Sequence, residues 1–162
     1  MNPDMEAVFR QRATRLADRR APSAARKSPE VLVCHAGRER YALELDDLTE
    51  VLPFSGCAPI PGAPAGLLGV INLRAELRPV MDLGGLLGAS KSSRELSGYI
   101  VLVRSCQAGL RVDQVGQILS LPGPVQRTGL PAGYVKAFLP DGLMLLDPAK
   151  LLSSFLHKEI QA

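Results

Sequence analysis

Hydrophobic and polar residues alternate along most of this chain in short runs that are typical of β-strands. From Val31 onward, apolar runs such as VLVCHA, YALEL, LLGVINL and ELRPVMDL are separated by turn-forming residues. Residues 55–66 hold three prolines and three glycines, a composition that predicts a loop because proline cannot donate to a strand ladder. The pattern predicts a mainly β protein.

Helical periodicity is confined to the two ends of the chain. Residues 3–20 form a charged segment with one thin apolar stripe, and residues 21–29 are rich in Pro, Ser and basic residues without periodicity. We therefore expect residues 1–29 to form a basic amphipathic helix plus a flexible linker, followed by a folded body that starts near Glu30. The functional interpretation of this helix is docking on a partner helix or an anionic surface.

The C-terminal run PAKLLSSFLHKEI predicts a second helix. Pro148 suits its first position and Asp147 suits its N-cap. The apolar face of this helix would consist of Leu151, Leu152, Phe155 and Leu156.

A segment of the first half of the chain recurs in the second half. Tyr41–Leu52 (YALELDDLTEVL) aligns with Ala108–Leu119 (AGLRVDQVGQIL) at an offset of 67 residues, and an offset of 65 aligns Asp82 with Asp147. We predict an internal duplication with one copy at roughly residues 30–90 and the other at roughly residues 98–150. Each copy is expected to form a small five-stranded barrel, because closure of a sheet removes its exposed strand edges. A functional surface is expected along the seam between the copies.

Composition and charge exclude several classes of function. The chain of 162 residues is 46% hydrophobic but only 4% aromatic, which predicts a core of Leu, Val and Ile. The whole net charge of +3 lies in residues 1–30, so an extended nucleic-acid-binding face is not expected. No run approaches the roughly 20 apolar residues of a membrane span. We expect a soluble, cytoplasmic protein.

Residues suited to catalysis or metal binding are scarce. The sequence holds two histidines, His35 and His157, and lacks a Gly-rich phosphate loop, an HExxH motif and a GxSxG motif. Cys34, Cys57 and Cys106 share no CxxC spacing and lie in or beside apolar runs, which predicts buried, reduced thiols. We expect no catalytic residue, metal or cofactor. The rival hypothesis of a cysteine nucleophile lacks an evident basic partner.

Two charged residues of the first copy stand among apolar neighbours where the second copy is uncharged. These are Glu50, whose counterpart is Gln117, and Arg74, which aligns with the FLP turn. A charged residue beside a strand usually faces solvent, and Glu50 taken alone fits that description. The stem of Arg74 can pack while its guanidinium group holds a carboxylate, and Glu50 is the predicted partner.

The run GVINLR at residues 69–74, followed by PVMD, makes the chain resemble the CheW-like chemotaxis coupling family. The flanking YALELDDLTEV, API-PGAP, GLRVDQV and LMLLD segments extend the resemblance over residues 31–155. It implies two intertwined, five-stranded SH3-like barrels, no catalysis and no cofactor. It also implies an adaptor between the regulatory domain of a CheA-type histidine kinase and the cytoplasmic tip of chemoreceptors, with membrane association only through those receptors.

The resemblance further implies where partners bind. The helical hairpin of a receptor is expected to dock near the groove between the barrels, at positions matching Leu45, Leu48, Glu50, Arg74 and Val112. The kinase regulatory domain, itself CheW-like, is expected to pair barrel to barrel, with Ile60, Leu68 and Gly69 as candidate contacts.

The chain departs from the family pattern at Ala75, where the family usually has Gly. If this position needs a positive φ angle, alanine strains the turn and reorients Arg74. The leading hypothesis is therefore a receptor–kinase coupling adaptor. The alternative is an accessory CheW-like adaptor that binds a receptor or another partner without coupling to the kinase.

Overall fold

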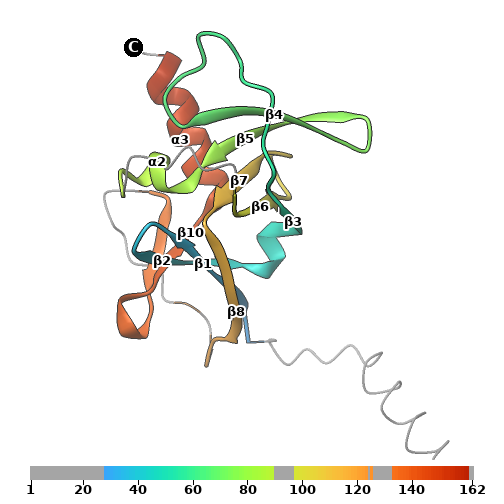
Figure 1. Cartoon of the computed structure of the whole chain (residues 1–162). Coiled ribbons are helices and arrows are strands. Elements are labelled where there is room, and N and C mark those ends of the chain that lie inside the picture. Colours follow the sequence, from blue (N-terminus) through green and yellow to red (C-terminus); the bar gives the residue numbers. More distant parts are fainter. Residues whose placement is uncertain (1–27, 90–96, 124, 126–132, 161–162) are drawn as a thin grey trace, which may run out of the picture.

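The computed structural model describes residues 28–89, 97–123, 125 and 133–160, and side chains up to residue 155. These residues form two five-stranded sheets with short helices between and after them (Figure 1). The prediction of a mainly β protein with five strands per unit is confirmed. The predicted N-terminal helix and most of its linker lie outside the described residues.

The first sheet has the strand order β8-β1-β2-β10-β9. Its strands are β1 (Glu30–Ala36), β2 (Glu39–Glu44), β8 (Gln114–Ser120), β9 (Val135–Phe138) and β10 (Met144–Leu146). The second sheet has the order β3-β6-β7-β5-β4. Its strands are β3 (Leu48–Pro53), β4 (Leu67–Leu73), β5 (Glu76–Asp82), β6 (Tyr99–Val103) and β7 (Gly109–Val112).

The repeat in the sequence is a repeat in the structure, with exchanged strands. Each sheet joins the first two strands of one copy to the last three strands of the other. The parallel pairing places Leu145 opposite Ala42 in the first sheet and Val80 opposite Gly109 in the second, and the offsets of 67 and 65 convert one pair into the other. Both sheets therefore cross the division between residues 30–90 and 98–150.

Two equivalent aspartates begin the helices that follow the last strand of each copy. Asp82 accepts a hydrogen bond from the Gly85 backbone N–H at 2.7 Å at the start of α2 (Leu83–Leu87). Asp147 accepts one from Lys150 at 3.1 Å at the start of α3 (Pro148–Ile160), as predicted. Helix α3 buries Leu151 and Leu152 and packs Phe155 against the main core, which contains residues of both sheets.

A single helical turn, η1 (Leu45–Asp47), precedes β3 without a side-chain cap, and the Asp47 carboxylate binds Lys136 at 2.7 Å. One local expectation is wrong. Cys34 is buried, whereas Cys57 is half-buried and Cys106 is exposed. Cys106 lies in the turn between β6 and β7, where an apolar neighbourhood in the sequence does not become an apolar neighbourhood in space.

Candidate functional site

The β4–β5 hairpin projects from the body as an arm, and the turn at its tip carries Arg74 and Ala75 (Figure 1). Leu73 pairs with Glu76, so the hairpin closes with two turn residues, and both have positive φ angles, 52° and 65°. Two-residue hairpin loops of this kind match the right-handed twist of the strands and favour Asn or Gly. Ala75 therefore occupies the strained conformation that its departure from the family pattern suggested.

Arg74 reaches back from this turn to β3. Its Nη2 atom lies 3.1 Å from Oε1 of Glu50, so the predicted ion pair is present, through one nitrogen and one oxygen. The Arg74 side chain is 77% exposed and that of Glu50 31% exposed. An ion pair this exposed adds little to stability. Because the Arg74 side chain is exposed, its guanidinium group is accessible to a partner.

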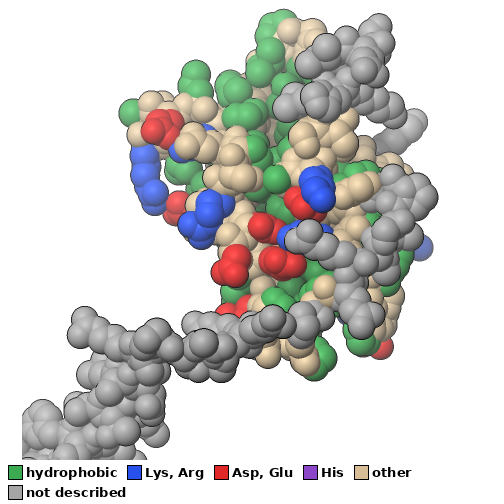
Figure 2. All heavy atoms as spheres, turned by 180° about the vertical axis from the view of Figure 1, so that it is seen from behind, with side chains coloured by type: hydrophobic (Ala, Val, Ile, Leu, Met, Phe, Trp, Pro, Cys, Tyr) green, Lys and Arg blue, Asp and Glu red, His purple; other side chains and the backbone are tan. Residues whose placement is uncertain are grey.

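Beside this ion pair lies a pocket of about 220 Å³ with a markedly basic wall. It is lined by Thr49, Glu50, Leu73, Arg74, Arg78, Leu102, Val103, Arg104 and Gln107. Arg78 forms an ion pair with Glu76 and donates from Nη1 to the Gln107 carbonyl at 3.4 Å. From behind, acidic and basic side chains gather along the hairpin arm and the neighbouring face (Figure 2).

Sequence reasoning missed Arg78 and Arg104 as members of this site. Arg104 directly follows the apolar run of β6, and a charged residue at the end of such a run was the available signal. Its Nε donates to the Asp46 carbonyl at 3.0 Å and its Nη2 to the Leu48 carbonyl at 2.7 Å. The second copy thus contributes a guanidinium group to a site whose other charges come from the first.

The apolar residues assigned to receptor binding lie deeper than Glu50 and Arg74. Leu45 is partly buried, Leu48 is 6% exposed and Val112 is fully buried, and all three contact the same core cluster. Leu48 and Val112 therefore lie beneath the surface, and the predicted residues that remain at least partly exposed are Leu45, Glu50 and Arg74.

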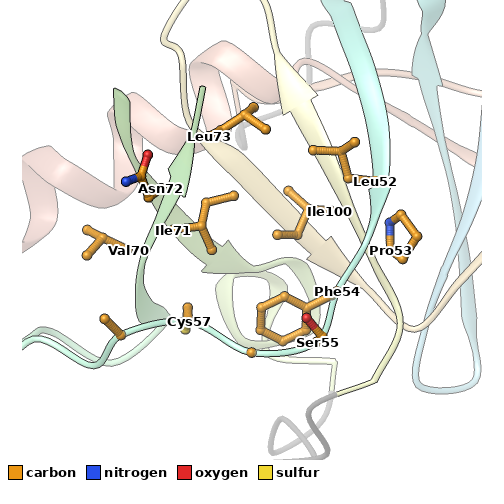
Figure 3. A pocket seen from close by; sticks show the side chains of 12 residues that line it. Leu52, Pro53, Phe54, Ser55, Cys57, Val70, Ile71, Asn72, Leu73 and Ile100 are labelled. Carbon is orange, nitrogen blue, oxygen red and sulfur yellow. The ribbon is translucent and has the colours of Figure 1, made fainter. Parts of the chain in front are cut away.

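A second depression, an open groove of about 700 Å³, runs between the edge strands β3 and β4 of the second sheet. In Figure 3, Leu52 and Ile100 face Ile71 and Leu73 across the groove, and Phe54 lies at one end. The whole lining is Leu52, Pro53, Phe54, Ser55, Gly56, Cys57, Ala58, Val70, Ile71, Asn72, Leu73 and Ile100. Leu73 lines both this groove and the basic pocket, so the two depressions adjoin.

The three candidate kinase contacts lie next to this groove. Ile60 is 39% exposed in the loop before β4, and Leu68 is partly buried. Gly69 has a φ angle of 153°, and a Cβ atom there would lie 2.2 Å from the Ala58 carbonyl oxygen. Gly69 therefore acts through its backbone, because its missing side chain lets Ala58 form two hydrogen bonds with Val70, at 2.8 and 2.9 Å.

The titratable groups of the described residues give no sign of an activated nucleophile. Burial raises the pKa of the Cys34 thiol to about 12, and burial also raises the pKa of Cys57. Both shifts oppose thiolate formation at neutral pH. Within the described ranges, no cluster of three or more His, Cys, Asp or Glu side chains could hold a metal ion. No helix in those ranges is long and apolar enough to cross a membrane.

The described surface offers other molecules two adjoining depressions, one with a basic wall and one lined mainly by apolar side chains. The family model described as "CheW-like domain" matches residues 30–155. The chain therefore belongs to the CheW-like family, as its sequence motifs indicated.

Relatives and a solved structure agree with this assignment. The chain is 29% identical to the chemotaxis protein CheW of Treponema pallidum, over 90% of this chain and 94% of that protein. It is 30% identical to the probable chemotaxis protein CheW of Rhizobium etli, over 82% and 91% of the two chains. The crystal structure of the scaffolding protein TtCheW from Thermoanaerobacter tengcongensis matches with a TM-score of 0.62 at 26% identity, covering 74% of this chain and 89% of that one.

Proposed function

We propose that this protein is a cytoplasmic chemotaxis adaptor that couples chemoreceptors to a CheA-type histidine kinase without catalysing a reaction. The CheW-like domain carries this proposal, because it spans both sheets and the buried turns of α3. Relatives that match over more than nine tenths of their own length are chemotaxis proteins. Coupling is then geometric: the adaptor fixes the position of one partner relative to the other.

The receptor surface is assigned to Leu45, Glu50 and Arg74, with Leu48 and Val112 as their buried support. Leu45 supplies apolar area for a receptor helix, and the Glu50–Arg74 ion pair supplies exposed charge on the hairpin arm. Charges at the rim of an interface contribute more to orientation and partner choice than to raw affinity. Arg74 is the residue on which this assignment depends most.

The kinase surface is assigned to the side of the second sheet that carries Ile60 and Leu68. Gly69 contributes by holding the 55–66 loop against β4. We assign each five-stranded sheet to an SH3-like barrel. In the second barrel, the edge strands β3 and β4 are not hydrogen-bonded to each other, and the open groove lies between them.

The test is binding of the purified full chain to a kinase regulatory domain and to a receptor-tip fragment, measured by calorimetry. Wild-type protein should bind both. Arg74→Glu should weaken receptor binding by roughly tenfold or more and leave kinase binding within about twofold, because it reverses one exposed charge of the receptor surface. Arg40→Glu is the matched control, since Arg40 is an exposed arginine on the first sheet.

Binding to the receptor tip without binding to the kinase would contradict the coupling role and favour the accessory adaptor. The strain at Ala75 is the observation that favours this alternative. Binding to neither partner would contradict both functions.

A further inference from the structure

Arg104 carries a positive charge that no described carboxylate neutralises. Arg74 is paired with Glu50 and Arg78 with Glu76, but both hydrogen bonds of the Arg104 side chain go to main-chain carbonyls, those of Asp46 and Leu48. A guanidinium group has five N–H donors in a fixed fork. Arg104 uses one on Nε and one on Nη2, so three of the five remain for a ligand.

These two carbonyl contacts also hold the fork in place. They attach Arg104 to η1 and to the first residue of β3, and its own backbone N–H donates to the Asp47 carbonyl at 2.8 Å. A guanidinium group held in this way loses little side-chain freedom when a carboxylate arrives, so binding costs less. The residue therefore presents a preorganised, unneutralised cation to the pocket that it lines.

The repeat shows that this charge is not required by the fold. Val31 pairs with Leu119 as Ile100 pairs with Leu52, so Arg104 corresponds to His35 in the first sheet, and Glu50 corresponds to Gln117. The β9–β10 hairpin is shorter than the β4–β5 hairpin and has no direct counterpart of Arg74. The first sheet thus forms the same ladder without an arginine at the position of Arg104. The basic pocket is thus specific to one copy, which points to a ligand rather than to architecture.

We propose that Arg104 binds a carboxylate side chain of the receptor's docking helix in the basic pocket that it shares with Arg74 and Arg78. This inference rests on the proposed receptor-coupling function and adds a specificity-determining residue to it. A receptor is the chosen partner because the pocket is continuous with the Glu50–Arg74 ion pair of the assigned receptor surface. The occupant is an Asp or Glu one helical turn from the residue that meets Arg74, since neighbouring positions on one helix face are three or four residues apart.

The test compares charge reversals at two arginines in the full chain. Arg104→Glu should weaken binding of the receptor-tip fragment by roughly tenfold, because it places a carboxylate against a carboxylate. Arg40→Glu is the matched control: Arg40 is also exposed, and its Nη2 donates to a main-chain carbonyl, that of Asp141 at 3.3 Å. Arg40→Glu should leave the affinity within about twofold of wild type.

A rescue experiment separates a direct partner from a structural role. Each acidic residue of the receptor-tip fragment is replaced by Lys in turn, and one of these fragments should regain most of the lost affinity for Arg104→Glu. Failure of every fragment to rescue overturns the proposal. Equal losses in Arg104→Glu and Arg40→Glu also overturn it, because the effect would then be general electrostatic steering.

Arg104→Gln covers the case in which Arg104→Glu does not fold. It should bind the receptor tip more weakly than wild type and with a smaller dependence on salt concentration, because one ion pair has gone. Unchanged affinity of Arg104→Gln, with Arg74→Glu still impaired, overturns this inference and leaves the proposed function intact. If wild-type protein does not bind the receptor tip at all, the function fails, and the inference fails with it.

Discussion

The two sheets share strand order and register but place their inter-strand charges differently. In the second sheet, Arg111 on β7 forms a buried ion pair with Asp82 at the end of β5, at 3.2 Å, with the two side chains 5% and 3% exposed. Arg111 also contacts Asp113 at 2.8 Å and the Ser97 carbonyl at 2.9 and 3.2 Å. The Arg111 side chain thus links β7 to the end of β5, and also binds Asp113 directly after β7 and Ser97 before β6.

In the first sheet, the residues equivalent to Arg111 and Asp82 are both acidic. They are Glu44 and Asp147, and the cation comes instead from Lys136 on β9. Lys136 lies 2.7 Å from Asp47 and 3.3 Å from Glu44. Burial alone would lower the pKa of Lys136, but the hydrogen bond to Asp47 and the charges of Asp47, Glu44 and Asp147 outweigh it, so the pKa is raised.

The residue equivalent to Lys136 in the second sheet is Leu68, because each is the unpaired residue at the irregularity of its strand. The next residue, Gly69, is equivalent to Ala137 and leaves room for the Ala58 backbone to approach β4. That approach fixes the loop that forms one end of the open groove. Packing thus preserves the strand arrangement in both copies, while the charges and one glycine decide which copy carries the depressions.

The largest expected effect comes from breaking the buried ion pair of the second sheet. Arg111→Met should lower the free energy of unfolding by about 3–5 kcal/mol, because it leaves the Asp82 carboxylate buried without its cation. Urea denaturation followed by circular dichroism measures this. Adding Asp82→Asn should recover part of the loss, and a loss below about 1 kcal/mol would mean that the pair behaves like a surface pair.

Gly69→Ala should have the next largest effect, about 2–3 kcal/mol of destabilisation, because a backbone contact of 2.2 Å forces Ala58 away from β4. Gly133→Ala is the matched control, since nothing lies within 4 Å of a Cβ atom there. Hydrogen exchange should show faster exchange at the Ala58 and Val70 amides in Gly69→Ala. Equal stability of the two variants would show that the loop can shift without cost.

Lys136→Met should destabilise the protein less, by about 1–2 kcal/mol near neutral pH, because its partners Glu44 and Asp47 remain 26% and 35% exposed to solvent. Its raised pKa sets the sign of the pH dependence. The stabilisation should be fully present below the ordinary lysine value of 10.5 and should disappear as the pH rises through the higher folded-state value. Wild type and variant should therefore converge in alkaline denaturation series, and a constant difference would exclude Lys136 as the source.

The sequence predicted the elements better than the site. Alternating runs and the repeat sufficed for five strands per copy, because strand periodicity and turn residues are local signals. These local signals could not predict the exchange of strands between copies, because a strand shows the same alternation of apolar and polar residues whichever strand it pairs with. The Glu50–Arg74 contact followed from charges in apolar surroundings, whereas Arg104 was missed because its partners are main-chain carbonyls 56 and 58 residues away.

The smallest effect concerns the two hairpin turns. Arg74 and Ala75 have φ angles of 52° and 65°, and Asp141 and Gly142 in the turn between β9 and β10 have 63° and 72°. Asp and Gly tolerate this left-handed conformation, whereas Ala pays a steric cost in it. Ala75→Gly should therefore stabilise the protein by roughly 1 kcal/mol, and Gly142→Ala should destabilise it by a similar amount.

A higher melting temperature for Ala75→Gly and a lower one for Gly142→Ala would establish that the left-handed conformation favours glycine in both turns and that Ala75 is strained. If Ala75→Gly also leaves receptor-tip binding unchanged, the strain is incidental to the position of Arg74. A gain in affinity would instead show that Ala75 holds Arg74 away from its best orientation, because the turn then relaxes toward the contact geometry. A loss of stability in Ala75→Gly would contradict the strained turn and move the difference between the hairpins to their side chains.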